Sequence, residues 1–241
     1  MGVLGNVKRG YDSLDEVEKR IEERKAAQGD FKPWRFWLKP KETASIIFLE
    51  DEPPVLEEHN LKVDGKWGNH FTCLKVTGED CPLCEAGDRP STVGFFTIID
   101  RRSFETSKGE KRKDTIKVFA AKFKVLKQLK KFSEKYGGLT GLEFEVERSD
   151  EKAPSTGDLL IREDKHETKA LLRILNEAGT KKDKEGNVVK LTDLEDVLIN
   201  WEDFLKPEEA KTLQKLSGNV KSDGKKDEKN SGKKGGKVDY D

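Results

Sequence analysis

The sequence has few of the residues that build large apolar cores or disulfide frameworks. Its 241 residues include three cysteines, one methionine and only 33% hydrophobic residues. An apolar share this low favours one modest core over the large packed core of a big enzyme. No stretch approaches the ~20 apolar residues of a membrane span, and the N-terminal MGVLGNVKRG lacks a signal peptide's apolar segment. We therefore expect an intracellular protein without membrane contact, in which three cysteines bind metal more naturally than they form disulfides.

The sequence also lacks the motifs that mark common enzyme chemistry. It contains no Gly-rich phosphate loop of Walker type, and no motif indicates a Ser or Cys nucleophile. Acidic pairs such as Glu57-Glu58 and Glu202-Asp203 lie among so many other charges that solvated surface explains them better than a catalytic dyad does. The sequence therefore predicts a binding protein and not an enzyme.

Net charge is absent as well, since Lys plus Arg and Asp plus Glu number 47 each. The charge is nevertheless segregated, because residues 86–136 contain 14 basic and 6 acidic residues, whereas residues 149–216 contain 12 and 16. A basic stretch rich in aromatic residues is typical of a nucleic-acid groove. A solvated lysine-rich face explains the same counts about equally well.

Hydrophobic patterning divides the chain into an N-terminal helical segment at 1–29, a core at 30–216 and a disordered Lys/Gly/Asp tail at 217–241. The N-terminal segment carries an amphipathic helix at 12–28. In the core, helices are expected at 122–136 and 166–179, and short strands within 34–49, 55–75, 93–105, 115–121, 142–148 and 158–164. This pattern predicts a mainly β fold with peripheral helices (α+β), built as an OB-fold-like antiparallel barrel with an inserted zinc knuckle.

The strongest chemical signal is the segment HFTCLKVTGEDCPLCEAG. Two residues separate His70 from Cys73, seven separate Cys73 from Cys81, and two separate Cys81 from Cys84. Two such clips predict one tetrahedral zinc ion in a subdomain at about 66–90, and four protein ligands make that zinc structural. The competing interpretation is a strand histidine beside small buried cysteines. Zinc deaminases have a glutamate two residues after the zinc-binding histidine. Thr72 occupies that position after His70, so the His-x-Glu motif is absent.

Aromatic and basic residues interleave on both sides of this cluster. Unstacked bases lie on aromatic rings, with ~1–3 kcal/mol for each stack, while Lys and Arg neutralise phosphates. Because side chains alternate along a strand, Phe36 must point away from Arg35 and Trp37, and some of the rings must be core. Two adjacent arginines at a strand end are hard to explain as buried core residues, so Arg101-Arg102 is the preferred phosphate contact. The predicted DNA-binding residues are Trp34, Arg35, Trp37, Lys39, Lys66, Trp67, Phe71, Phe95, Arg101, Arg102, Phe104 and Lys122.

The order of these motifs, WRFWLKPKETASIIFLED, then a His and three Cys ending in CPLCEAG, then VGFFTIIDRR, resembles the single-stranded DNA-binding proteins of tailed bacteriophages. The resemblance is to the helix-destabilising proteins of T-even type and covers roughly residues 30–150. It implies an OB-fold with a zinc subdomain that binds single-stranded DNA without sequence preference in phage replication, recombination and repair. It also implies a location in the host cytoplasm, phage replication and recombination proteins as partners, and self-association on DNA.

Two features depart from that family. The histidine of the T-even proteins lies farther from the first cysteine than His70 lies from Cys73. Their C-terminal tail is strongly acidic, whereas residues 217–241 contain 7 Lys and 5 acidic residues here. The alternative function is a zinc-stabilised RNA-binding or protein-interaction module without a role on single-stranded DNA.

Overall fold

The computed structural model describes residues 33–63, 65–105, 109, 111–182, 186–218 and 220. The chain forms two compact units. The larger unit combines the chain up to Val55 with Val93–Phe204, and the smaller unit combines Leu56–Thr92 with the chain from Leu205 onward. The predicted helix at 12–28 and almost all of the predicted tail lie outside the described residues. Within the described residues, no helix is long and apolar enough to cross a membrane.

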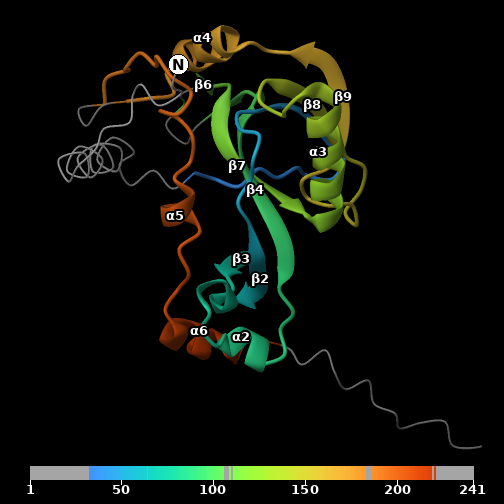
Figure 1. The fold of residues 1–241 in the computed structure, drawn as a ribbon, viewed down its shortest axis with the longest axis vertical. Helices are drawn as coiled ribbons and strands as arrows, with labels where there is room; N and C mark the ends of the chain where they lie inside the picture. Colours follow the sequence, from blue (N-terminus) through green and yellow to red (C-terminus); the bar gives the residue numbers. More distant parts are fainter. Residues whose placement is uncertain are drawn as a thin grey trace, which may run out of the picture. The chain divides into compact units, whose positions relative to one another are not determined.

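The larger unit is built on an antiparallel sheet with helices beside it (Figure 1). Its strands run in the order β7-β4-β1-β8-β9, because Ile98 of β4 pairs with Phe48 of β1 along one edge and with Lys117 of β7 along the other. β-Branched and aromatic residues, which favour pleated buried strands, dominate β1 and β4. The elements are β1 (Glu42–Phe48), β4 (Ser91–Asp100), β5 (Phe104–Glu105), β6 (Lys111–Arg112), β7 (Thr115–Lys122), α3 (Phe123–Tyr136), β8 (Leu142–Arg148), β9 (Asp158–Lys165), α4 (Thr168–Glu177) and α5 (Trp201–Phe204).

This sheet is open, so the mainly β class with helices is confirmed but the predicted closed barrel is wrong. Closure requires the two end strands of a sheet to pair with each other. Within the described residues β9 pairs with β8, and the outer edge of β7 is bridged by an extended segment through Arg35 and Val118. Phe36 N donates to Val118 O at 2.7 Å, and Val118 N donates to Trp34 O at 3.0 Å. The start of the predicted strand region 34–49 is therefore not a regular strand. It forms this isolated bridge to β7, on the edge that a closing strand would occupy.

Phenylalanines form the centre of the core in the larger unit. The ring centroid of Phe48 lies 5.1 Å from that of Phe96 and 5.3 Å from that of Phe144, both edge to face. The Phe119 ring lies 5.5 Å from Phe48 on the same cluster. Edge-to-face rings pack at this range with favourable quadrupole geometry. The buried Leu129 brings α3 onto this cluster.

The helix predicted at 122–136 is confirmed as α3, and the glycine pair stops it as expected. Gly137 has a φ of 67°, in the left-handed region that glycine adopts without strain. Gly138 N donates to the carbonyl of Ser133 at 2.9 Å, which satisfies one of the last helical acceptors. One helix face packs on the core through Val125, Leu126, Leu129, Phe132 and Tyr136.

The smaller unit is organised around a hairpin and three short helical elements. They are β2 (Val55–Val63), β3 (Lys66–Thr72), η1 (Leu74–Thr77), α2 (Pro82–Glu85) and α6 (Ala210–Ser217). The two strands pair antiparallel, with His59 opposite Phe71. Leu213 of α6 is fully buried in a small core with Leu61, Leu74 and Leu83. The zinc subdomain expected at about 66–90 is therefore part of a unit that starts at Leu56 and includes α6.

Candidate functional site

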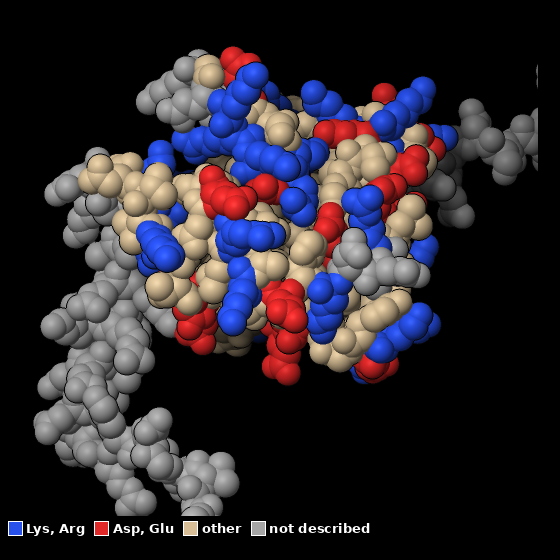
Figure 2. All heavy atoms as spheres, turned by 90° about the horizontal axis from the view of Figure 1, so that it is seen from above, with Lys and Arg blue, Asp and Glu red and all other residues tan. Residues whose placement is uncertain are grey.

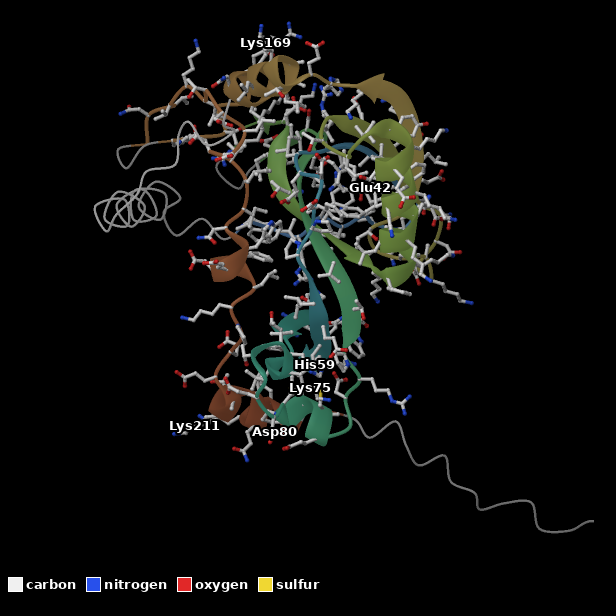
Figure 3. The ribbon with its side chains drawn as sticks, in the orientation of Figure 1. Glu42, His59, Lys75, Asp80, Lys169 and Lys211 are labelled. Carbon is white, nitrogen blue, oxygen red and sulfur yellow. The ribbon has the colours of Figure 1, made fainter. Side chains whose placement is uncertain are left out.

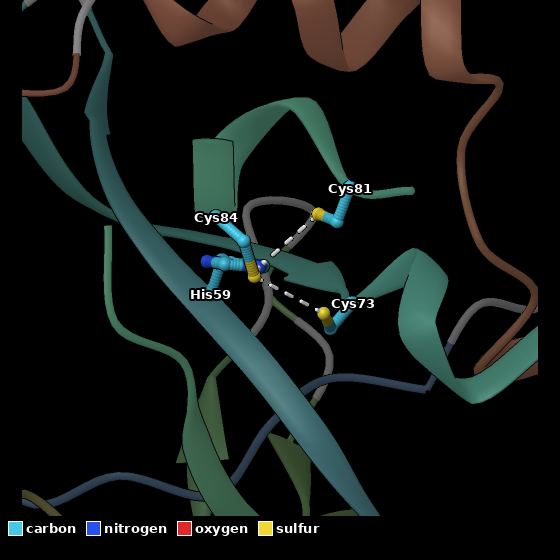
Figure 4. Close-up of side chains that lie close together, drawn as sticks. All are labelled: His59, Cys73, Cys81 and Cys84. Carbon is cyan, nitrogen blue, oxygen red and sulfur yellow. Dashed lines mark hydrogen bonds between the residues drawn. The ribbon is translucent and has the colours of Figure 1, made fainter. Parts of the chain in front are cut away.

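Four potential metal ligands meet in the smaller unit (Figure 4). His59 projects from β2, Cys73 follows β3, Cys81 caps the N-terminus of α2, and Cys84 lies within α2. One ligand atom from each of these residues lies within 4.8 Å of the others, and all but Cys84 are buried. The three cysteines are free thiols. This buried group of one imidazole and three thiols can hold a metal ion such as zinc.

The spacing of the ligand atoms fits a tetrahedral ion. Zn–S bonds of about 2.3 Å and Zn–N bonds of about 2.0–2.1 Å put sulfur atoms about 3.8 Å apart and sulfur about 3.6 Å from nitrogen. His59 Nε2 lies 3.4 Å from Cys81 Sγ and 3.6 Å from Cys84 Sγ. Cys73 Sγ lies 3.6 Å from Cys84 Sγ. These separations are close to those that one shared ion requires.

The two ring nitrogens of His59 have different partners: Nδ1 faces Asp88 and Nε2 faces the thiols. His59 Nδ1 lies 2.5 Å from Asp88 Oδ2, while the ring itself is fully buried. A carboxylate at Nδ1 keeps the proton there, which leaves the Nε2 lone pair free to bind a cation. Metal-binding histidines commonly have such a carboxylate partner. Asp88 therefore orients the imidazole toward the three sulfurs.

The thiols differ in acidity. Burial, together with the neighbouring thiols of Cys73 and Cys81, raises the pKa of Cys84 to about 12. Burial also raises the pKa of Cys73 above its ordinary value. At Cys81 burial is outweighed by backbone hydrogen bonds, the strongest from Cys84, which lower the pKa to about 7. Since metal ligands must be thiolates, ion binding at this cluster releases protons.

The prediction of His70 as the fourth ligand is wrong. Its ring lies on β3 with Nδ1 3.1 Å from Glu58 Oε2, and it is not part of the cluster. Successive side chains of a strand point to opposite faces, so a residue three positions before Cys73 faces away from it. His59 is paired directly with Phe71, two positions before Cys73, and so faces the cysteines. The alternation of the strand therefore selects His59.

Sequence signals for His59 existed. The dipeptide Asp-Gly at 64–65 is a common hairpin turn, and a strand folded back there brings His59 near residues 70–71. In the structure His59 pairs with Phe71. The resemblance pointed the same way, because the histidine of the T-even proteins lies farther from the first cysteine. Asp88 carried no comparable signal, since its contact with His59 joins residues 29 positions apart.

A second feature lies in the larger unit and is a pocket of about 200 Å³. Two aromatic rings border it, Trp37 with 51% and Phe104 with 42% of its surface exposed. Lys117 Nζ lies 5.8 Å from the centroid of the Phe104 ring. The lining residues are Trp37, Lys39, Glu42, Asp100, Arg102, Ser103, Phe104 and Lys117. The pocket thus combines accessible rings with three cationic and two anionic side chains.

The charges of this pocket are mostly paired with each other. Arg102 Nη1 lies 2.6 Å from Glu42 Oε1, and its Nη2 lies 2.7 Å from Asp100 Oδ2. Lys117 Nζ lies 2.8 Å from the same Asp100 oxygen. Burial alone would raise the pKa of Asp100, but hydrogen bonds from Arg102 and Lys117 hold it below its ordinary value. The pocket floor is therefore a fixed ion-pair network.

The same kind of contact engages both Arg101 and Arg102, which the sequence predicts as the preferred phosphate contacts. Arg101 Nε lies 2.6 Å from Asp114 Oδ1, and the Arg102 guanidinium is held by Asp100 and Glu42. Burial alone would lower the pKa of Arg102, but the hydrogen bonds that its guanidinium donates to Asp100 and Glu42 raise it. A bidentate phosphate contact would have to displace these carboxylates. Both arginines pair with carboxylates near the end of β4 while remaining partly exposed, and their role as phosphate contacts stays a prediction.

The other predicted DNA-binding residues divide by exposure. Trp34, Trp37, Lys39, Lys66, Trp67, Phe104 and Lys122 are exposed. Arg35 is half-buried, with its guanidinium carbon 5.3 Å from the centroid of the Phe95 ring. Lys117, which sequence reasoning did not single out, joins the exposed rings at the pocket because β7 and β4 pair.

One predicted ring, that of Phe95, is a core residue, which corrects its assignment as a stacking platform, whereas that of Phe71 stays a prediction. Phe95 is fully buried, and its ring centroid lies 6.2 Å from that of Trp201. Phe71 is half-buried and packs on the core of the smaller unit. Phe95 thus follows the ordinary preference of phenylalanine for the interior.

Comparison of the chain with protein-family models and with curated proteins gives no match. The functional interpretation therefore rests on the chemistry of the Cys/His cluster and of the aromatic pocket.

Proposed function

We propose that this protein binds single-stranded DNA without sequence preference and is not an enzyme. The observation that carries the proposal is the pocket in which the accessible rings of Trp37 and Phe104 lie beside the exposed Lys39. A single strand presents flat base faces and regularly spaced phosphates. Rings beside lysines match both features, and a flexible strand can enter a pocket that a duplex cannot.

The exposure of the tryptophans supports stacking. Trp34 is 76% exposed and Trp67 is 68% exposed, although a large indole normally gains free energy by burial. Trp201 behaves in the ordinary way, since it packs against Phe204 and donates from Nε1 to Glu50 at 3.0 Å. Base stacking on an aromatic ring contributes about 1–3 kcal/mol, which gives the exposed rings a reason to face solvent.

Electrostatic attraction supplies the second part of the affinity. Lys39 and Lys66 are exposed next to Trp37 and Trp67. Figure 2 shows Lys and Arg side chains spread over one face, with Asp and Glu among them. Because lysines bind phosphates by releasing counterions, the affinity should fall steeply as salt rises.

We further propose that the Cys/His cluster holds one zinc ion with a structural role. Four protein donors complete a tetrahedron and leave no position for a reacting water. A bound zinc ion would supply a cross-link between β2, the end of β3 and α2. That cross-link would hold the hairpin that carries Trp67 in one conformation.

The resemblance to the T-even single-stranded DNA-binding proteins suggests the process in which the protein acts. It supports a protein that protects and organises single strands in phage DNA replication, recombination and repair. Replication and recombination proteins of the phage would then be its partners in the host cytoplasm.

Titration with oligo-dT tests the proposal, with tryptophan emission as the signal at two salt concentrations. We expect saturable quenching that weakens with salt, and Trp37→Ala should lose about 5–150-fold in affinity, which corresponds to about 1–3 kcal/mol of stacking. Leu160→Ala, which removes a 53% exposed side chain from β9, is the matched control and should bind as the wild type does. Equal affinity for duplex DNA, or binding of structured RNA alone, would contradict the proposal.

A further inference from the structure

The outward face of α3 carries a line of lysines. Lys124, Lys127, Lys131 and Lys135 are all exposed and follow one another at spacings of three, four and four residues. Residues three and four apart lie on the same side of a helix, and the rise of 1.5 Å per residue makes this line about 16 Å long. We call these four residues the α3 lysine stripe.

The charge of the stripe is not compensated by carboxylates in the part of the chain that the structure describes. Glu134 is the only acidic residue of α3, and it pairs with Lys130, outside the stripe, at 3.8 Å. Lys127 Nζ lies 4.6 Å from the centroid of the Phe123 ring, and Lys135 Nζ lies 4.9 Å from that of Tyr136. These cation–π contacts orient two ammonium groups without neutralising them.

The stripe is also held in place. The opposite face of α3 packs on the core of the larger unit through the fully buried Leu129 and the partly buried Leu126 and Phe132. At the C-terminal end of the helix, Lys165 Nζ donates to the carbonyl of Tyr136 at 3.1 Å. Positive charges on a docked helix keep their spacing, so a ligand need not order the backbone that presents them.

We propose that the α3 lysine stripe binds the sugar–phosphate backbone of the single strand, as a contact surface separate from the Trp37 pocket. This inference rests on the proposed function. Lysine is a point charge that contacts phosphates without reading bases. A protein partner is less suited to the stripe, because protein interfaces are depleted of lysine and need an apolar centre. The apolar side chain exposed beside the stripe, Phe123, lies under Lys127.

Salt-dependent binding of full-length protein to oligo-dT, followed by tryptophan emission, tests the inference. The test variant K124Q/K127Q/K131Q/K135Q removes four charges and keeps good helix formers. The control variant K152Q/K169Q/K182Q/K190Q removes four exposed lysines elsewhere in the larger unit, so the change in net charge is identical (Lys169 is labelled in Figure 3). Since each lost lysine–phosphate contact lowers the slope of log K against log salt by about 0.7, the stripe variant should bind with a slope about 2–3 shallower than the wild type. The control variant should keep the wild-type slope.

Equal slopes in the stripe and control variants would overturn the inference while leaving the proposed function intact. Absence of oligo-dT binding by the wild type would refute the proposed function instead. In that case, retention of the wild type and the two variants on inorganic polyphosphate tests whether the stripe binds phosphates. Loss of retention by the stripe variant and not by the control variant would support the stripe as a phosphate-binding surface. Equal retention of all three proteins would overturn it. Competition by poly-glutamate as effective as that by oligo-dT would assign the stripe to an acidic protein partner and overturn the inference. Matching circular dichroism melts of the three proteins establish that the substitutions leave the fold unchanged.

Discussion

His59 connects two parts of the smaller unit through its two ring nitrogens. Its Nε2 lies among the sulfurs, whereas its Nδ1 lies against Asp88. Each contact determines the other, because a proton fixed on Nδ1 leaves Nε2 as the electron-pair donor. His70, nearer to Cys73 in the sequence, has neither contact.

Replacement of the two histidines distinguishes these roles. We expect His59→Ala to lose stoichiometric zinc, because three thiolates remain without a fourth donor and without the carboxylate-oriented imidazole. His70→Ala should retain zinc at the wild-type level. Metal content after desalting, together with the absorption of the cobalt-substituted protein, measures both. Loss of metal in His70→Ala with retention in His59→Ala would reverse the ligand assignment.

Asp100 is a buried carboxyl through which the larger unit can respond to acid. Its carboxyl is almost fully buried and has a pKa below its ordinary 3.8 because Arg102 and Lys117 stabilise the ionised form. A carboxyl with a lowered folded pKa stabilises the fold above its unfolded pKa, and this contribution is lost as pH falls through the folded value.

We therefore expect the melting temperature of the larger unit to fall below about pH 4. Asp100→Asn should be less stable by about 1–3 kcal/mol at pH 7, because it leaves two cations with a weaker partner, and its stability should depend less on acid. Thermal melts between pH 2 and 7 measure this, with the exposed Asp158→Asn as control. Parallel acid profiles for Asp100→Asn and the wild type would show that Asp100 is not the responsible group.

At the scale of elements, β4 and α3 meet at a single glycine. A Cβ added to Gly94 would overlap the end of the Leu126 side chain. The absence of a side chain at this point of β4 lets the helix pack closely on the strand. The contact holds the start of the helix that presents the lysine stripe.

Gly94→Ala should therefore destabilise the larger unit by about 1–3 kcal/mol through overpacking. In Leu126→Ala the overlap is absent, so adding Gly94→Ala to that background should cost much less. Urea denaturation of the two single variants and the double variant gives the coupling free energy. Additive losses would indicate that Gly94 is needed for a reason other than contact with Leu126.

Local patterns in the sequence predicted the elements better than their partners. The α3 helix, its glycine stop and the strands β4, β7 and β8 were predictable, because periodicity and turn residues are local properties. Cys73, Cys81 and Cys84 come together as their spacing indicated. The fourth ligand depended on strand register, and Glu42, one of the partners of Arg102, lies 60 positions away in the sequence. Such contacts arise from the fold and leave no local pattern.

At the scale of the whole molecule, the two units have separate cores and only the smaller one contains the Cys/His cluster. The small core has a few leucines and half-buried neighbours, which is little apolar area to offset the entropy of folding. A bound ion would therefore supply much of the stability of the smaller unit.

Chelation of the metal should unfold the smaller unit and leave the larger one intact. Hydrogen exchange read by mass spectrometry should show lost protection confined to peptides from 56–92 and 205–218, with those of β4, β7 and β8 unchanged. Re-addition of zinc should restore protection. Exchange that rises equally in both units would mean that the two cores fold as one.

The smaller unit is assembled from two stretches of chain that are made at different times. His59, Cys73, Cys81 and Cys84 all leave the ribosome long before Leu213, which completes the small core. The four side chains are therefore available to a metal ion while the apolar surface formed by Leu61, Leu74 and Leu83 is still uncovered. A chain truncated before Ala210 lacks α6, so this apolar surface stays uncovered and accessible to chaperones and proteases. Because α6 ends at Ser217, it can dock only after the larger unit has been translated.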